Sequence, residues 1–233
     1  MQQTGQTIRQ PAEPFRLVAD PDCRTKEDLA LSSTWRYSLD EQAIADLDRA
    51  VAAVEMQRLP LVDVRRNAFE LPILGKTLHA IREQIIDGRG FVLLRGVPVH
   101  RYTRLQSAIA FWGIGTYIGE AVSQNAEGHL LGHVKYLGDT SLNNPGHRGY
   151  QTPNTLPFHS NSTDVVGLLC LHASKSGGES TIASSVTIHN ETLKRAPELV
   201  AALNESIYRD RRGSRQRRNR TIGFPSSTRS RAI

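Results

Sequence analysis

Hydrophobic residues recur at helical spacing in three stretches of the first half of the chain. The first stretch predicts a helix over about 39–57, with Ser38 and Glu41 as a capping box at its start. The second predicts a helix over 73–87 that ends at Gly88. The third predicts a helix that begins after Thr103 and ends near Ile118.

Short hydrophobic runs at 61–64 and 91–94 predict strands in the first half of the chain. After Gly119, runs at 130–136, 156–159, 165–172 and 180–186 alternate with polar turns and predict further strands. Thr187 is expected to cap a helix to about Arg195, and Pro197 to begin a helix to about Leu203. This order of elements predicts an α+β fold, with an antiparallel β core flanked by N-terminal helices.

Composition divides the 233 residues into three parts. Residues 1–35 are expected to form an extended N-terminal segment, and residues 36–208 one domain. Residues 209–233 contain nine Arg and one acidic residue, which leaves 20 basic and 22 acidic residues in 1–208. The net charge of +6 therefore comes from this segment, which we expect to be disordered because it has few hydrophobic residues.

Hydropathy and cysteine content indicate where the protein resides. The longest hydrophobic run, 165–171, is far shorter than the roughly 20 residues of a membrane span, so no membrane contact is expected. The N-terminus has no basic segment followed by an apolar stretch, as a secretory signal would. Cys23 and Cys170 form neither a disulfide framework nor a cysteine metal motif. These observations predict a cytoplasmic protein.

One of the eight histidines occupies a position that suits metal binding. His159 ends a short apolar run and begins the polar turn 160–164, which is the local half of a site with two His and one carboxylate for Fe(II). His129 and His133 have a spacing of four, which binds metal on a helix, but they flank a predicted loop or strand. His79 and His189 are interpreted as structural.

Three blocks of sequence, in order, resemble the TauD/TfdA family of Fe(II)/2-oxoglutarate-dependent oxygenases. They are residues 87–96, residues 149–171 around His159, and residues 173–190 with the Gly177-Gly178 turn. The resemblance covers roughly residues 60–212. It implies a partial double-stranded β-helix (jelly roll), Fe(II) and 2-oxoglutarate as cofactors, and hydroxylation of a small molecule.

The same resemblance assigns roles to individual residues. His159 matches the first iron ligand, and Asn161 takes the position of the second ligand in the local His-x-Asp motif. Ser180 matches the hydroxyl that holds the 2-oxoglutarate carboxylate. No catalytic side chain is assigned.

The sequence departs from the family pattern in two places. Asn161 stands where the family has Asp, and an amide oxygen is a poorer ligand for Fe(II) than a carboxylate; Asp164 is an alternative donor. Only 72 residues follow Asn161, and neither His172 nor His189 is followed by an Arg at the family's spacing. We therefore expect a truncated or frame-shifted family member with impaired activity.

Two other interpretations stay open at this point. The chain can be an inactive remnant or pseudoenzyme, or a protein that binds nucleic acid or another acidic surface through its Arg-rich segment. Nucleic-acid binding is the less favoured, because no aromatic residues interleave the arginines. An incomplete jelly roll would leave a sheet edge unpaired, which predicts self-association.

Overall fold

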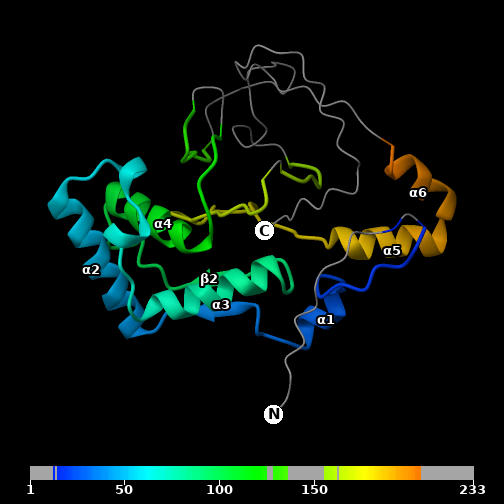
Figure 1. Cartoon of the computed structure of the whole chain (residues 1–233), viewed down its shortest axis with the longest axis horizontal. Coiled ribbons are helices and arrows are strands. Elements are labelled where there is room, and N and C mark those ends of the chain that lie inside the picture. The colour runs from blue at the N-terminus through cyan, green and yellow to red at the C-terminus, as the bar shows by residue number, and fades with distance from the viewer. Residues whose placement is uncertain (1–12, 14, 125–127, 136–154, 162, 206–233) are drawn as a thin grey trace.

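The computed structural model describes residues 13, 15–124, 128–135, 155–161 and 163–205. Two groups of helices lie at opposite ends of the molecule, and long irregular segments run between them (Figure 1). In chain order the elements are α1 (Lys26–Ala30), β1 (Arg36–Ser38), α2 (Glu41–Gln57), the 3-10 helices η1 (Leu61–Asp63) and η2 (Arg66–Ala68), α3 (Leu74–Ile86), β2 (Leu93–Arg95), α4 (Arg104–Ile118), α5 (Ser185–Arg195) and α6 (Pro197–Leu203).

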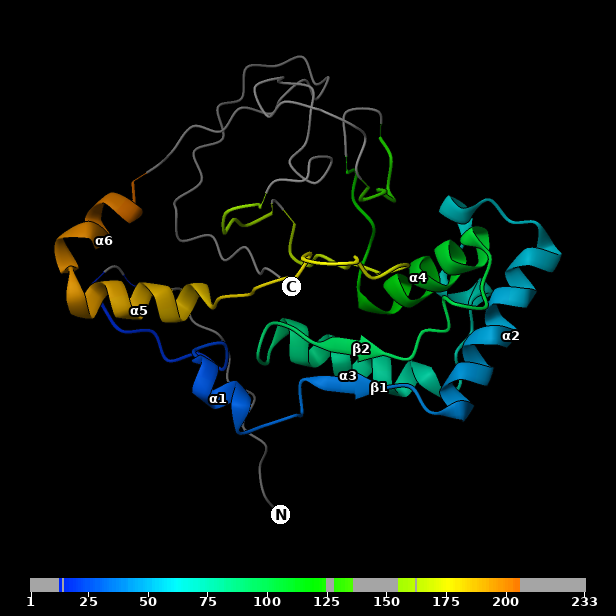
Figure 2. The ribbon, with the colours of Figure 1, turned by 180° about the vertical axis from the view of Figure 1, so that it is seen from behind.

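Helices α2, α3 and α4 pack together and enclose the main hydrophobic core. Figure 2 shows them from behind, grouped with the two strands on the side away from α5 and α6. Most of the apolar positions that predicted the three helices are buried between them: Leu47, Leu78 and Ile109 are at most 3% exposed, whereas Leu105 is 58% exposed. The three predicted helices are therefore confirmed, with ends within about two residues of the expected ones.

Capping side chains fix where these helices begin. Thr103 caps α4 and forms a capping box with Gln106, as the sequence predicted for the start of this helix. At α2 the cap is Asp40, whose carboxylate accepts the amide of Ala43 at 2.8 Å, so the predicted Ser38–Glu41 box is wrong. Ser38 instead belongs to β1, where its backbone is already paired.

The sheet consists of two short parallel strands. Tyr37 of β1 lies opposite Leu94 of β2, and α2, η1, η2 and α3 form the connection between the strands. The strand predicted at 91–94 is observed as β2, which begins two residues later and ends one residue later than predicted. The predicted strand at 61–64 is wrong: these residues form η1, whose amides bond to carbonyls three residues earlier, as Asp63 does to Pro60.

The strands predicted between 130 and 184 are absent from the described residues there, so the antiparallel β core is not seen in this part of the chain. Residues 180–184 are irregular, and Ser185 already begins α5. Alternating hydrophobicity shows that a segment can be half-buried, but a strand forms only beside a partner that takes its backbone hydrogen bonds. Phe158 and Leu168, which belong to two of the runs predicted to be strands, are 70% and 68% exposed.

Helices α5 and α6 pack on each other and on no other helix or strand among the described elements. Ser184, not Thr187, is the N-cap of α5, and its hydroxyl accepts the Thr187 amide at 3.1 Å. Pro197 stands at the first turn of α6, as predicted. In the expected extended segment 1–35, residues 26–30 form the short helix α1.

No helix in the described ranges is both long enough and apolar enough to cross a membrane. The Arg-rich segment predicted to be disordered, 209–233, lies outside the described residues.

Candidate functional site

His159 lies in an irregular segment and its imidazole is exposed. Its Nδ1 is 2.9 Å from the carbonyl oxygen of Pro157, and because a carbonyl only accepts, Nδ1 must carry the proton. The neutral ring then has its lone pair on Nε2. Metal-binding histidines commonly have this arrangement, in which the second ring nitrogen donates to a backbone carbonyl. The geometry around His159 therefore suits a metal ligand.

Asn161 and Asp164 carry the amide oxygen and the carboxylate nearest to His159 along the chain. Asn161 is half-buried and Asp164 is exposed. Between them, the hydroxyl of Thr163 bonds to the Val165 carbonyl at 3.3 Å and so stiffens the turn. The ligand roles of His159 and Asn161 stay predictions.

Ser180 follows a tight turn, as its predicted role requires. Gly177 and Gly178 both have positive φ angles, 70° and 80°, which a glycine adopts without strain. The Ser174 hydroxyl closes the turn by donating to the Gly177 carbonyl. Ser180 itself is exposed, and no hydrogen bond in the described part of the chain joins it to His159 or Asn161.

An iron site of the family type needs three protein ligands on one face of the metal. Within the described ranges, no group of three or more His, Cys, Asp or Glu side chains is close enough to hold a metal ion. The described residues therefore do not make up a facial triad, and by themselves they do not fit Fe(II).

Two of the other histidines lie on helices and contact neighbouring groups. His79 is 3.4 Å from Glu83 one turn later on α3. His189 on α5 approaches the Arg16 carbonyl at 3.2 Å, which agrees with the structural role expected for it. His133 and His172 are exposed in irregular segments.

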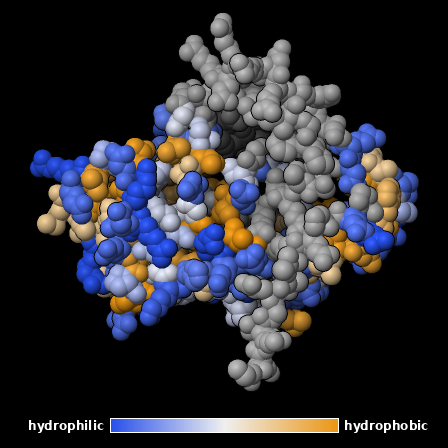
Figure 3. Space-filling view, viewed as in Figure 1, coloured by the Kyte–Doolittle hydropathy of each residue, from blue (hydrophilic) through white to orange (hydrophobic). Residues whose placement is uncertain are grey.

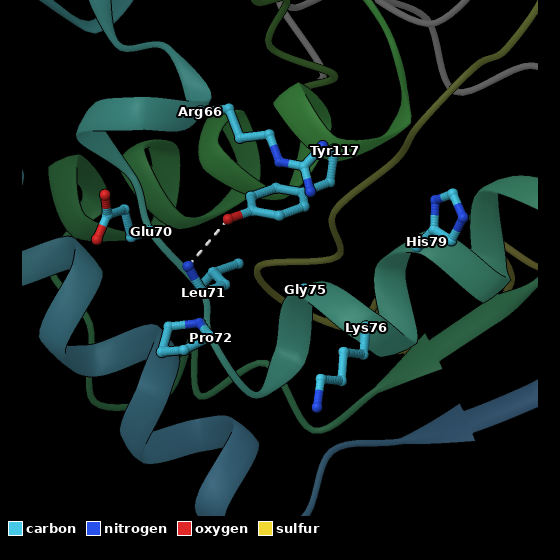
Figure 4. Close-up of a pocket in the computed structure, with 8 residues that line it drawn as sticks. All are labelled: Arg66, Glu70, Leu71, Pro72, Gly75, Lys76, His79 and Tyr117. Carbon is cyan, nitrogen blue, oxygen red and sulfur yellow. Dashed lines mark hydrogen bonds between the residues drawn. The ribbon is translucent and has the colours of Figure 1, made fainter.

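A hollow of about 670 Å³ lies on the helical body, between η2, α3 and α4. Its floor is Tyr117 of α4, whose hydroxyl accepts the Leu71 amide at 2.9 Å and donates to the Phe69 carbonyl at 3.0 Å (Figure 4). Gly75 of α3 leaves room for this ring, since a Cβ there would lie 3.0 Å from Tyr117 Cε1. The guanidinium of Arg66 stacks over the ring at 4.4 Å.

None of the residues predicted for the iron site lines this hollow. Its charged side chains, Arg66, Glu70 and Lys76, are all exposed, and in Figure 4 Lys76 points away from Tyr117. The charges are therefore not gathered at one point where a ligand could sit. No local sequence motif points to this hollow, because Arg66 and Tyr117 lie far apart in the chain.

Comparison with known proteins identifies the family. The family profile described as "Taurine catabolism dioxygenase TauD, TfdA family" matches residues 57–231. The chain belongs to the TauD/TfdA family. The match includes His159, Asn161 and Ser180, and it runs beyond residue 212, where the resemblance was expected to end.

Two curated relatives support this membership of the TauD/TfdA family. FR-33289 synthase of Streptomyces rubellomurinus is 37% identical over 182 residues, which are 78% of this chain and 54% of the relative. Taurine hydroxylase-like protein SAT17 of Stachybotrys chartarum is 32% identical over 173 residues, 72% of this chain and 45% of the relative. The chain thus spans about half the length of the curated relatives it matches.

Proposed function

We propose that this chain is a dioxygenase-like protein of the TauD/TfdA family that acts on a small molecule and contributes His159 to an Fe(II) site. The observation that carries the proposal is the His159 ring, which lies within the family match and has its Nδ1 proton bound to the Pro157 carbonyl. A histidine whose Nδ1 donates to a backbone carbonyl can offer Nε2 to a metal, and this supports the proposal. Fe(II) with 2-oxoglutarate would supply the oxidising chemistry when bound, and Ser180 is proposed to hold the 2-oxoglutarate carboxylate.

We further propose that iron binding and turnover are impaired in this chain. Asn161 offers a neutral amide oxygen where the family pattern has an anionic carboxylate, and a hard divalent cation prefers the charged ligand. The exposed setting of His159 adds to this weakness, because water competes for the metal. Asp164, three residues along the same turn, is the one nearby carboxylate that could compensate.

A metal titration tests the site itself. Co(II), a spectroscopic substitute for Fe(II), is added to the wild-type chain and to His159→Ala, Asn161→Asp and His133→Ala. We expect weak binding by the wild type, loss in His159→Ala, and about tenfold tighter binding in Asn161→Asp because a carboxylate replaces the amide. His133→Ala is the matched control, since His133 is an exposed histidine outside the proposed site. Equal Co(II) binding by His159→Ala and His133→Ala would show that His159 is not a metal ligand.

Succinate formation from 2-oxoglutarate, with Fe(II) and ascorbate in excess, tests the proposed impairment. We expect no turnover by the wild type or by Asn161→Asp, because a carboxylate at 161 still leaves the described residues short of three ligands. Turnover by the wild type would show that the chain has a complete ligand set. Asp164→Asn and His172→Ala would then be the first variants to examine.

A further inference from the structure

The N-terminal segment of residues 16–24, called here the N-terminal strap, runs along α5 although more than 160 residues separate them in sequence. In Figures 1 and 2 this dark blue segment lies beside α5 and then leads into α1. The strap has no helix or strand of its own, so its backbone groups need partners from elsewhere. Side chains of α5 provide several of them.

Two side chains of α5 each bind a strap residue through both backbone groups. The Asn190 amide accepts the Val18 N–H and donates to the Val18 carbonyl, both at 2.9 Å. The Thr187 hydroxyl accepts the Arg24 N–H and donates to the Arg24 carbonyl, again at 2.9 Å each. Asn190 is only 7% exposed, so these bonds are shielded from water. This two-way pairing imitates the contacts that a neighbouring strand would make.

The start of α5 adds a third contact to the same stripe. The Ser184 hydroxyl, which caps α5, also donates to the Asp22 carboxylate at 3.3 Å. Ser184, Thr187 and Asn190 are three residues apart and therefore follow one side of the helix. Together they form a polar stripe that contacts the strap along most of its length.

The far side of the strap is fixed to the helical body. The Arg24 guanidinium bonds to the Arg89 carbonyl and lies over the Phe91 ring at 4.4 Å, just before β2. Asp22 packs against Gly90, where a Cβ would lie 3.0 Å from the carboxylate. Gly90 has a positive φ of 86°, so the loop is shaped to receive this side chain. The strap is thus bound on both sides.

This double attachment matters because α5 and α6 touch no other helix or strand in the described part of the chain. The strap lies between the two groups of helices and binds both. We propose that the Ser184–Thr187–Asn190 stripe is a docking surface for the backbone of an extended segment, and that the strap is its occupant and latches α5–α6 to the body. The latch also holds in place the segment that precedes α5, which carries Ser180.

Amide hydrogen exchange in the full-length chain tests the latch residue by residue. Thr187→Val removes the hydroxyl that binds Arg24, and we expect the Arg24 amide to exchange about tenfold faster. Asn190→Ala should do the same for the Val18 amide. The matched control is Thr192→Val, because Thr192 is on the same helix and bonds to the Ile188 carbonyl instead of the strap. It should leave both amides unchanged.

Limited trypsin digestion gives a second readout of the same latch. Arg24 is a trypsin site whose side chain is 10% exposed, and a protease must take the surrounding backbone into an extended conformation. Cleavage after Arg24 should be slow in the wild type and Thr192→Val and about tenfold faster in Thr187→Val and Asn190→Ala. Protected amides in α3 and α4 would show that each variant is still folded.

Two results would overturn the proposal. In the first, Thr187→Val and Thr192→Val have the same effect on Arg24 exchange and cleavage, so the stripe does not hold the strap. In the second, the contacts form between two copies of the chain, so that the protection of the Val18 and Arg24 amides in the wild type rises with protein concentration. The latch within one chain predicts that strap protection is independent of protein concentration.

Discussion

Asp46 on α2 holds the start of α3 through the backbone amide of Leu74. The carboxylate oxygen Oδ2 accepts this amide and that of Ile73, both at 2.9 Å, and Oδ1 accepts Arg49 at 2.8 Å. Asp46 is 1% exposed, so it is a buried charge whose partners are two N–H groups at the N-terminus of a helix. No side chain of α3 caps its own first turn.

Replacing Asp46 should therefore destabilise the helical body. We expect Asp46→Ala to lower the free energy of unfolding by about 2–4 kcal/mol, since the buried amide of Leu74 and the part-buried amide of Ile73 lose their acceptor. Asp46→Asn keeps one acceptor oxygen and should cost about half as much. Urea denaturation followed by circular dichroism measures both. Asp63→Ala, an exposed aspartate on η1, is the control and should change stability by less than about 0.5 kcal/mol.

Substitution by alanine at two glycines of α4 should change the stability of the protein in opposite directions. A Cβ on Gly113 would lie 2.2 Å from the Phe69 ring, whereas a Cβ on Gly115 would meet nothing within 4 Å. Gly113→Ala should destabilise the fold by about 2 kcal/mol or more, because the fully buried Phe69 has no room to move. Gly115→Ala should stabilise it by about 0.5–1 kcal/mol through higher helix propensity. Thermal melts of the two variants would reveal the opposite shifts, and equal shifts would contradict the packing described.

Tyr102 should make stability sensitive to alkaline pH. Burial, and then the hydrogen bond to Asp48 at 2.5 Å and its negative charge, raise the pKa of the Tyr102 phenol above its usual value. The raised pKa belongs to the folded state, so this contribution is complete below about pH 10, the pKa of an unfolded tyrosine, and is lost as pH rises further. Stability measured between about pH 9 and pH 11.5 should fall more steeply in the wild type than in Tyr102→Phe. If stability fell equally steeply with pH in the wild type and in Tyr102→Phe, Tyr102 would not be the group that makes stability sensitive to alkaline pH.

Exposed apolar side chains in the irregular segments should cause self-association. Val134, Phe158 and Leu168 are 65%, 70% and 68% exposed, and Figure 3 shows hydrophobic surface on the helical body beside the part drawn in grey. Dynamic light scattering should detect a particle size that grows with protein concentration. This growth should be smaller in the double variant Phe158→Ser, Leu168→Ser. Leu31→Ser is the control, because Leu31 is 88% exposed but lies beside α1. If Leu31→Ser reduced the growth in particle size equally, Phe158 and Leu168 would not be the residues through which the chains associate.

The sequence predicted helices well because each carries its own evidence. The apolar positions of α2 and α3 repeat at helical spacing, and Thr103 and Pro197 mark helix starts by local chemistry. The errors at α2 and α5 each shift the cap to another polar residue nearby, from Ser38 to Asp40 and from Thr187 to Ser184. Two capping residues within a few positions of each other cannot be ranked without knowing which backbone amides need a partner.

Strands were predicted less well, because they depend on partners distant in sequence, and the predicted iron-site residues stay predictions. Nothing local shows that residues 165–172 lack a neighbouring strand, or that Tyr37 pairs with Leu94. Thr187 was interpreted only as a helix cap, and its contact with Arg24 was missed. The three-residue spacing of Ser184, Thr187 and Asn190 was the available signal, since small polar residues on one side of a helix often bind backbone. The His159 motif could be proposed from the sequence because its evidence lies in consecutive residues, and its metal role stays a prediction.

The strap also sets an order of events during synthesis. Val18 is made 172 residues before Asn190, the side chain that will pair with it. At roughly 5–20 residues per second, the start of a nascent chain waits about 10–30 s for that partner. The core of α2, α3 and α4 is complete by Ile118, so it can form during this interval. A ribosome-bound chain stalled before α5 should therefore have a folded body and an N-terminus still open to proteases.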